Sequence, residues 1–227
     1  RKIYRKIRKN RKRSIMNQKS ESAITFISTT LLAAFACTLI FFLVKFLACF
    51  SAAGKLPEIY NYPLIRISIY GSSFENSSST ISARISFLDS DSSEFAVFER
   101  SWNGLSLSME FLTSSFCGKT VVFPYRIFAG VMESENFDFS RKQEISRRGT
   151  KLFHYFNENG QCLLYGSRNS VQIKKSLYTL AQFALISRMQ PSSKFFDKRE
   201  LNFSGLKYGE TYTVYTGFDG EIHLSKD

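Results

Sequence analysis

The segment Cys-Gly-Lys-Thr at residues 117–120 ends like a phosphate-binding loop. That loop needs a glycine at position 113, where this chain has Thr113. It also needs a helix directly after the lysine, because the first amides of the helix cradle the phosphates. The residues after Lys119 are apolar and β-branched, which predicts a strand. The segment therefore does not support nucleotide binding.

Two other patterns suggest metal chemistry, and neither is complete. Asp89, Asp91 and Ser93 resemble the opening of a calcium loop, but the sixth position is Glu94 instead of Gly and the twelfth is Arg100, so a polar hairpin turn is the better interpretation. The chain has only two histidines, and they have no paired zinc-ligand spacing. We predict no metal site and no cofactor.

Cys162 and His154 could serve as nucleophile and base in a membrane-tethered hydrolase or transferase. Such an arrangement is loosely similar to the sortase transpeptidases, which combine one membrane anchor with a β-rich exported domain. The Thr-Leu-x-Thr-Cys strand motif of that family is missing here, and His154 precedes Cys162 by only eight residues. The resemblance therefore assigns no catalytic residue.

Cys117 and Cys162 are the two cysteines outside the apolar segment. In an oxidising compartment they could form a disulfide that closes a loop of about 45 residues, worth roughly 4 kcal/mol in the chain-entropy model. The alternative is two buried free thiols in apolar strands. The sequence alone leaves both open.

Five segments between Pro57 and Gly130 have the composition or the period of two that is typical of β-strands, and polar turns separate them. Pro124 interrupts the last of them, which predicts an edge position or a bulge. The spacing predicts an antiparallel meander of about five strands. The segments are residues 64–70, 81–87, 95–99, 105–111 and 120–128.

Residues 132–150 have no sustained period, and we expect a long surface loop there. The loop carries a cluster of positive charge that could contact an acidic partner or remain solvated. The residues of this possible interaction loop are Arg141, Lys142, Arg147 and Arg148.

The C-terminal third predicts two hairpins and one helix. Residues 151–165 resemble a hairpin around Asn159-Gly160, and residues 211–224 resemble another around Gly217–Gly220. Between them, Asn169 or Ser170 can cap a helix that ends before Pro191. The fold class is therefore α+β and strand-dominant, with the helix packed on a sheet.

An apolar segment precedes this strand-rich domain. It is 22 residues long, from Ala23 to Val44, and contains no charge, Gly or Pro. As an α-helix it extends about 33 Å, enough to cross a hydrocarbon core of about 30 Å. The helix should continue to Phe50, with Lys45 extending towards one interface. We therefore predict a transmembrane helix or signal anchor over residues 23–50.

Charge asymmetry predicts the orientation of this helix. Residues 1–22 carry ten Lys or Arg and one acid, whereas residues 57–227 carry 19 basic and 18 acidic residues. The positive-inside rule places the basic tail in the cytoplasm and residues 57–227 across the membrane. The net charge of +12 lies mainly in the tail, so the nearly neutral domain gives no support for nucleic-acid binding.

Processing could change the anchor without changing the exported domain. Met16 could be the true start, so that residues 1–15 are not translated. Small residues from Ser51 to Ala53 could allow cleavage, and Cys49 could carry a lipid, which would make the protein secreted or lipid-anchored. The longer apolar core favours an uncleaved anchor.

These observations predict a single-pass protein of the cell membrane. Its exported domain would have a binding, interaction or envelope-structural role, with membrane lipid and other envelope or membrane proteins as partners. The alternatives are a membrane-tethered hydrolase or transferase with an unrecognised site and an accessory subunit of a membrane complex.

Overall fold

The structure is a computed structural model. It describes residues 2–57, 61–75, 78–104, 106–130, 149–166, 168–187, 195–217 and 219–227, with side chains from Phe26 onward except at 73–78 and 130. The chain forms two compact units, residues 1–47 and residues 48–227, which are described separately.

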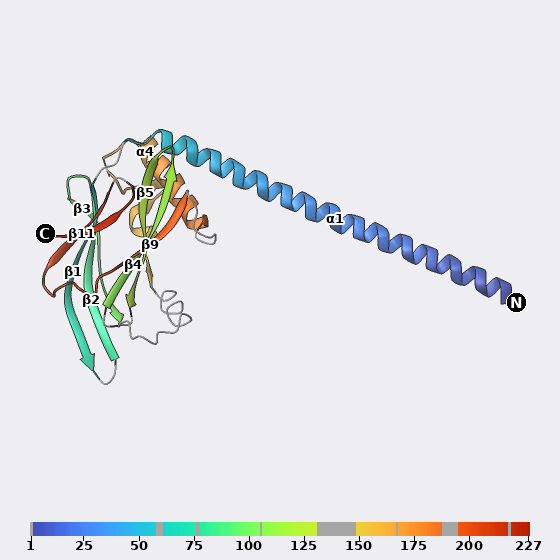
Figure 1. Ribbon diagram of the computed structural model, residues 1–227, viewed down its shortest axis with the longest axis horizontal. Coiled ribbons are helices and arrows are strands. Elements are labelled where there is room, and N and C mark those ends of the chain that lie inside the picture. Colours follow the sequence, from blue (N-terminus) through green and yellow to red (C-terminus); the bar gives the residue numbers. More distant parts are fainter. Residues whose placement is uncertain are drawn as a thin grey trace. The chain divides into compact units, whose positions relative to one another are not determined.

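Helix α1 runs from Lys2 to Gly54 (Figure 1). Residues 2–53 contain neither Gly nor Pro, so nothing in the sequence interrupts the helical hydrogen bonds before Gly54. The predicted helix over 23–50 is confirmed and extends further in both directions. The last turn tightens, because the amides of Lys55 and Leu56 donate to the carbonyls of Ala52 and Ala53.

The first sheet of the domain has five antiparallel strands in the order β11-β10-β1-β2-β3. Its inner face is apolar: Ile65 and Ile67 of β1 lie opposite Phe87 and Ile85 of β2, and all four are fully buried. The strands are β1 (Tyr62–Glu75), β2 (Ser78–Leu88), β3 (Glu94–Asn103), β10 (Thr211–Thr216) and β11 (Ile222–Lys226).

The second sheet has four antiparallel strands in the order β6-β5-β4-β9. Its strands are β4 (Ser106–Phe116), β5 (Lys119–Gly130), β6 (Thr150–Lys151) and β9 (Phe196–Asn202). Figure 1 shows the two sheets side by side. The indole of Trp102 in β3 donates a hydrogen bond of 3.1 Å to the Thr150 hydroxyl in β6, so the face that carries Thr150, Ile127 and Met109 is the one turned towards the first sheet.

Helix α4 (Val171–Ser187) covers the opposite face of the second sheet. Its Phe183 ring lies 5.1 Å from the ring of Phe196 in β9, on the face away from Thr150. The Ser170 hydroxyl accepts a hydrogen bond of 3.4 Å from the Ile173 amide, which confirms the predicted cap. The helix buries Leu177, Leu180, Ala181 and Ala184, in agreement with the predicted packing on a sheet.

The α+β, strand-dominant class is confirmed and all five predicted strands are present, but they are divided between two antiparallel sheets. The chain leaves the first sheet after β3, and β4 and β5 pair with each other and with β9 instead. Pro124 lies at a register shift between β4 and β5, which confirms the predicted bulge. Alternation within a strand shows which face is buried, whereas sheet membership depends on partners distant in the sequence.

Two local predictions need correction. Residues Phe153–Phe156 form the short helix α3 instead of a hairpin strand, and only β7 (Asn157–Glu158) and β8 (Gln161–Cys162) pair around the turn. The turn itself is confirmed, with φ of 50° at Asn159 and 73° at Gly160. Strand β9 was not predicted, because its sequence FDKRELN contains four charges and little apolar alternation.

Candidate functional site

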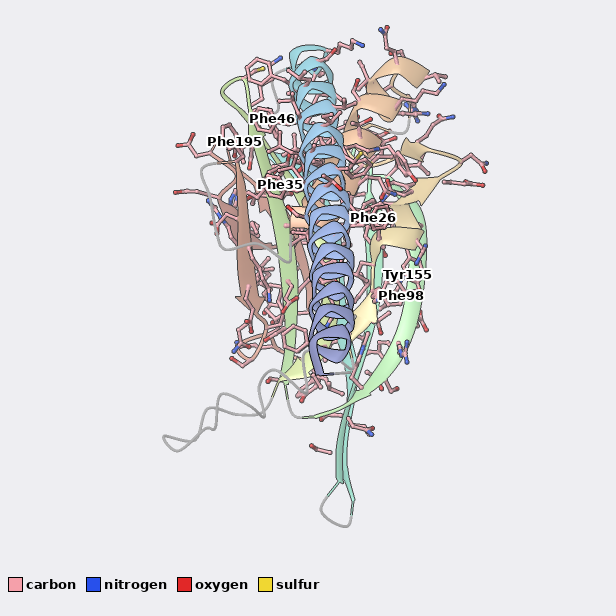
Figure 2. The ribbon with its side chains drawn as sticks, turned by 90° about the vertical axis from the view of Figure 1, so that its right-hand side faces the viewer. Phe26, Phe35, Phe46, Phe98, Tyr155 and Phe195 are labelled. Atoms are coloured by element: carbon pink, nitrogen blue, oxygen red, sulfur yellow. The ribbon has the colours of Figure 1, made fainter. Side chains whose placement is uncertain are left out.

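The apolar part of α1 exposes large side chains along its length. Residues Phe26–Gly54 contain an 18-residue stretch with a mean hydropathy of 2.4, and the segment is long and apolar enough to cross a membrane. Phe26, Leu31 and Phe35 are each about two-thirds exposed (Figure 2). An apolar helix surface that no protein core covers needs an apolar environment of another kind.

The three threonine hydroxyls of the apolar part of α1, those of Thr29, Thr30 and Thr38, donate to carbonyls of the same helix. The hydroxyl of Thr30 donates to the Phe26 carbonyl at 2.5 Å, and the hydroxyl of Thr38 donates to the Ala34 carbonyl at 2.7 Å. Lys45 is the one charge in the segment from residue 26 to 54, and its ammonium lies 5.7 Å from the centroid of the Phe41 ring. Internal pairing of this kind is what a hydrocarbon environment demands of a helix.

The last turns of α1 belong to the folded domain. Cys49, Ala52, Ala53 and Leu56 recur at helical spacing and are buried. The amino group of Lys119 binds the Leu56 carbonyl just beyond the helix, where a cation is favourable. The chain therefore enters the domain through a packed contact with the turn between β4 and β5.

That turn contains the Cys-Gly-Lys-Thr segment, and its geometry is that of a tight hairpin. Cys117 and Gly118 have φ of 54° and 71°, and Phe116 pairs with Lys119. No helix follows Lys119, which agrees with the rejection of a phosphate-binding loop. The Cys117 thiol donates a hydrogen bond of 3.6 Å to the Phe50 carbonyl.

A row of four charged residues crosses the outer face of the second sheet. Lys151, Arg126, Glu110 and Glu200 lie directly opposite one another on β6, β5, β4 and β9, so their side chains share one face. We call these residues the charged row. Glu110 is only 3% exposed, and one of its carboxylate oxygens lies 2.7 Å from the ammonium of Lys198.

Sequence reasoning did not identify the charged row. Each member looks like an ordinary solvent-facing residue of an alternating strand. Register was the missing information, and no local signal specified which strands would be neighbours.

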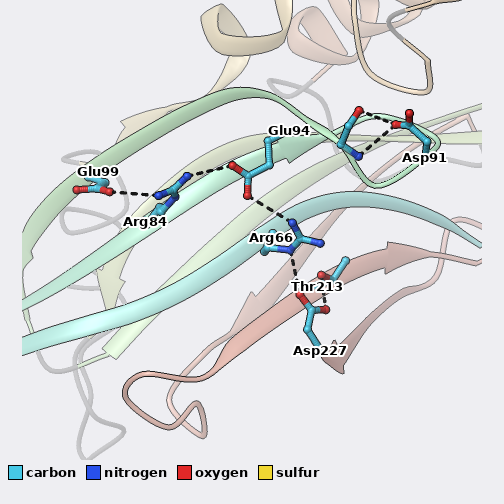
Figure 3. Close-up of polar contacts among 8 residues, drawn as sticks. Arg66, Arg84, Asp91, Glu94, Glu99, Thr213 and Asp227 are labelled. Carbon is cyan, nitrogen blue, oxygen red and sulfur yellow. Dashed lines mark hydrogen bonds and ion pairs between the residues drawn. The ribbon is translucent and has the colours of Figure 1, made fainter.

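The outer face of the first sheet carries a second network of charges (Figure 3). Arg66 of β1 contacts Glu94 at 3.4 Å and Asp227 at 2.9 Å, and Arg84 of β2 contacts Glu94 at 3.1 Å. Burial alone would raise the pKa of Glu94, but hydrogen bonds from Ser86, Arg84 and Arg66 outweigh it and hold the pKa below its ordinary value. We call this set the surface network.

An aromatic surface lies at strand β3, which is an edge of the first sheet. The rings of Phe98 and Tyr155 stack with their centroids 4.4 Å apart, and Tyr155 is part-exposed (Figure 2). Val97 of the same strand is also exposed. Apolar side chains beside a strand edge that has no partner strand in the described part of the chain are features of protein interaction sites.

The structure places the two cysteines in different environments. Both are free thiols, and Cys117 is exposed in the β4–β5 turn whereas Cys162 is buried in β8 beneath α4. Cys117 and Cys162 therefore form no disulfide in this structure. The alternative of two buried thiols holds for Cys162 alone.

Cys162 and His154 also differ in environment. Burial raises the pKa of the Cys162 thiol to about 12, so it is protonated near neutral pH and is a poor nucleophile. His154 lies exposed on α3, where its ring packs edge-on against Phe153 at 6.3 Å. The arrangement does not support a cysteine enzyme that uses this pair.

The acidic segment at Asp89 forms a polar turn between β2 and β3. The Asp91 carboxylate accepts hydrogen bonds from the amide and the hydroxyl of Ser93, which lower the pKa of Asp91. Within the described ranges, no group of three or more His, Cys, Asp or Glu residues is placed to hold a metal. The predicted interaction residues Arg141, Lys142, Arg147 and Arg148 lie outside the described residues.

No protein-family model, no curated protein and no solved structure matches this chain. Its functional assignment therefore depends on the sequence and on the geometry above.

Proposed function

We propose that this protein is a single-pass membrane protein whose strand-rich domain lies outside the cytoplasm and binds other components of the membrane or envelope. One observation supports the anchor most directly: the apolar part of α1 exposes Phe, Leu and Ile side chains while pairing its own threonine hydroxyls. The ten basic residues before it favour a cytoplasmic N-terminus.

The binding role draws support from the surface at β3. Phe98 and Tyr155 lie on one face of the edge strand and Val97 is exposed on the other face, so a partner can add backbone hydrogen bonds along the edge and side-chain contacts on either side of it. A photo-reactive amino acid at position 97 should form adducts in native membranes, whereas the same group at the exposed position 208 should not. Equal labelling at both positions would argue against a specific surface at β3.

Cysteine accessibility tests the membrane topology. In a Cys117→Ser background the remaining native cysteines are Cys49 and Cys162, which are buried, and Cys37, which lies within the apolar helix. A single thiol is then added by Tyr208→Cys on the domain or by Ser20→Cys in the basic tail.

Intact cells are treated with a membrane-impermeant maleimide before and after permeabilisation. The thiol at position 208 should react in intact cells, and the thiol at position 20 only after permeabilisation. The reverse pattern would overturn the orientation. Release of the protein by alkaline carbonate without detergent would overturn the anchor.

A further inference from the structure

Three phenylalanines gather where α1 enters the domain. Phe116, at the end of β4, is buried, and the Phe195 ring stacks on it at a centroid distance of 5.4 Å. The Phe50 ring meets Phe116 edge-on at 6.5 Å. We call Phe50, Phe116 and Phe195, together with Lys119, the entry surface.

The two outer rings of the entry surface are only partly covered. Phe50 is 50% exposed and Phe195 is 40% exposed, although both pack against a buried ring. Phe195 lies well away from the Phe98–Tyr155 pair on the domain, so this is a separate surface (Figure 2). Ordered aromatic side chains that remain exposed indicate a contact with something other than water.

The chemistry of the entry surface matches a lipid headgroup layer. The Lys119 ammonium sits at the carbonyl end of the helix, and Lys55 is exposed beside it. Aromatic rings and long basic side chains are the residues that favour the boundary between hydrocarbon and water. Either a zwitterionic or an anionic headgroup can accept this combination.

The length of the apolar helix supports the same position. Residues Phe26–Gly54 number 29, which corresponds to about 43 Å of helix. A bilayer with both headgroup layers is about 40–45 Å thick. A helix that spans it fully places Phe50, four residues before Gly54, about 6 Å inside the outer boundary.

We propose that the entry surface of the domain rests in the headgroup layer of the membrane that α1 crosses, with Phe195 and Phe50 as its interfacial contacts. The proposal depends on the proposed membrane anchor. It adds that the domain contacts the bilayer through the entry surface. An anchor alone would not require any contact between the domain and the lipid.

Fluorescence quenching by brominated lipid tests the contact in the full chain. Trp102 is the one tryptophan, so Trp102→Phe provides the background for Phe195→Trp. Tyr208→Trp in the same background is the matched control, because Tyr208 is exposed and its neighbour Gly209 donates its amide to the Ile69 carbonyl in the middle of β1, in the first sheet. Each variant is reconstituted in phosphatidylcholine bilayers with and without phosphatidylglycerol.

The tryptophan at position 195 should lose fluorescence in brominated lipid, and the tryptophan at position 208 should not. Equal quenching at both positions, or none at position 195 in protein that floats with the vesicles, would overturn the entry-surface proposal. Failure to float with the vesicles would instead refute the anchor. Stronger quenching with phosphatidylglycerol would identify anionic headgroups as the preferred ligand.

A second measurement avoids both tryptophan substitutions. Cys117 is the exposed thiol of the domain and lies in the turn beside Phe116, so a nitroxide can be attached there in a Cys37→Ala background. In bilayers, a polar nickel relaxation agent should reach this nitroxide less well than one attached at Tyr208→Cys. Equal access at the two positions would also overturn the proposal.

Discussion

The outer faces of the two sheets carry charged residues in similar numbers but in opposite environments. On the first sheet, the surface network joins Arg66, Arg84 and Glu94 at the solvent boundary. On the second sheet, the charged row places Glu110 and Arg126 in the interior. The comparison shows that an alternating polar position in a strand does not by itself indicate contact with solvent.

The difference has a physical consequence for stability. Exposed ion pairs gain little because water screens both charges, and they typically contribute about 0–1 kcal/mol. A buried charge that loses its partner costs about 3–5 kcal/mol, because the remaining group has been removed from water without compensation. The same type of substitution should therefore have very different effects on the two sheets.

The largest effect is expected at the centre of the charged row. Glu110→Ala should lower the free energy of unfolding by about 3–5 kcal/mol, because it removes the buried carboxylate that pairs with Lys198 at 2.7 Å and takes the negative charge away from the surroundings of the buried Arg126, which lies on the opposite residue of β5. Urea unfolding of the full chain in detergent, followed by Trp102 fluorescence, measures the change. Glu99→Ala on the first sheet is the control, and its effect should stay within about 0.5 kcal/mol. If both substitutions lower the free energy of unfolding equally, the charges on the two outer faces do not differ in their contribution to stability.

The edges of the two sheets offer the next comparison. The Tyr165 hydroxyl accepts a hydrogen bond of 2.9 Å from the Val122 amide and donates one of 2.7 Å to the Val122 carbonyl, so it takes the place of a strand partner at Val122, beyond the short pairing of β5 with β6. Tyr165→Phe should cost about 2–4 kcal/mol, since two buried backbone groups lose their partner. Thermal unfolding by circular dichroism measures this cost. Tyr155→Phe, at the part-exposed β3 edge, should change stability by less than about 0.5 kcal/mol.

Two glycines test how tightly each sheet is covered. A Cβ at Gly149 would lie 2.6 Å from Cδ of Arg126 and 2.7 Å from the Ile127 carbonyl oxygen, so Gly149→Ala should destabilise the domain by about 1–3 kcal/mol. A Cβ at Gly71 on the first sheet would meet Ser82 at an ordinary 3.6 Å. Gly71→Ala should be close to neutral in the same melting experiment. A neutral Gly149→Ala would show that Arg126 can move aside.

The smallest effect is expected from the surface network and depends on pH. Because the folded-state pKa of Glu94 is lowered, its ionised form stabilises the fold above the ordinary value of 4.5, and this contribution disappears as the pH falls through the folded-state pKa. Glu94→Gln should therefore cost less than about 1 kcal/mol near neutral pH, because the group is largely exposed. Melting temperatures of both proteins should converge in acid. If the melting temperatures of the two proteins still differ well below pH 4.5, the effect of Glu94→Gln comes from packing and not from the charge of Glu94.

The long apolar helix and most of the strands could be predicted because their signals are local. Twenty-two residues without charge, Gly or Pro specify a long apolar helix in any context. The alternation from Ile81 to Phe87 correctly indicated which side chains would be buried. The turn at Asn159-Gly160 was predictable for the same reason, since its backbone angles depend on two adjacent residues.

Sheet membership and the special environments came only from the tertiary structure. Whether β4 joins β3 or β9 depends on contacts between residues about ninety positions apart, and propensity carries no information about such pairs. The same long-range pairing aligned the charged row, buried Cys162 while leaving Cys117 exposed, and gathered Phe50, Phe116 and Phe195 at one end of the domain. The sequence by itself determined the local elements and the apolar span, whereas tertiary packing decided which polar and aromatic groups are buried and which remain available for contact.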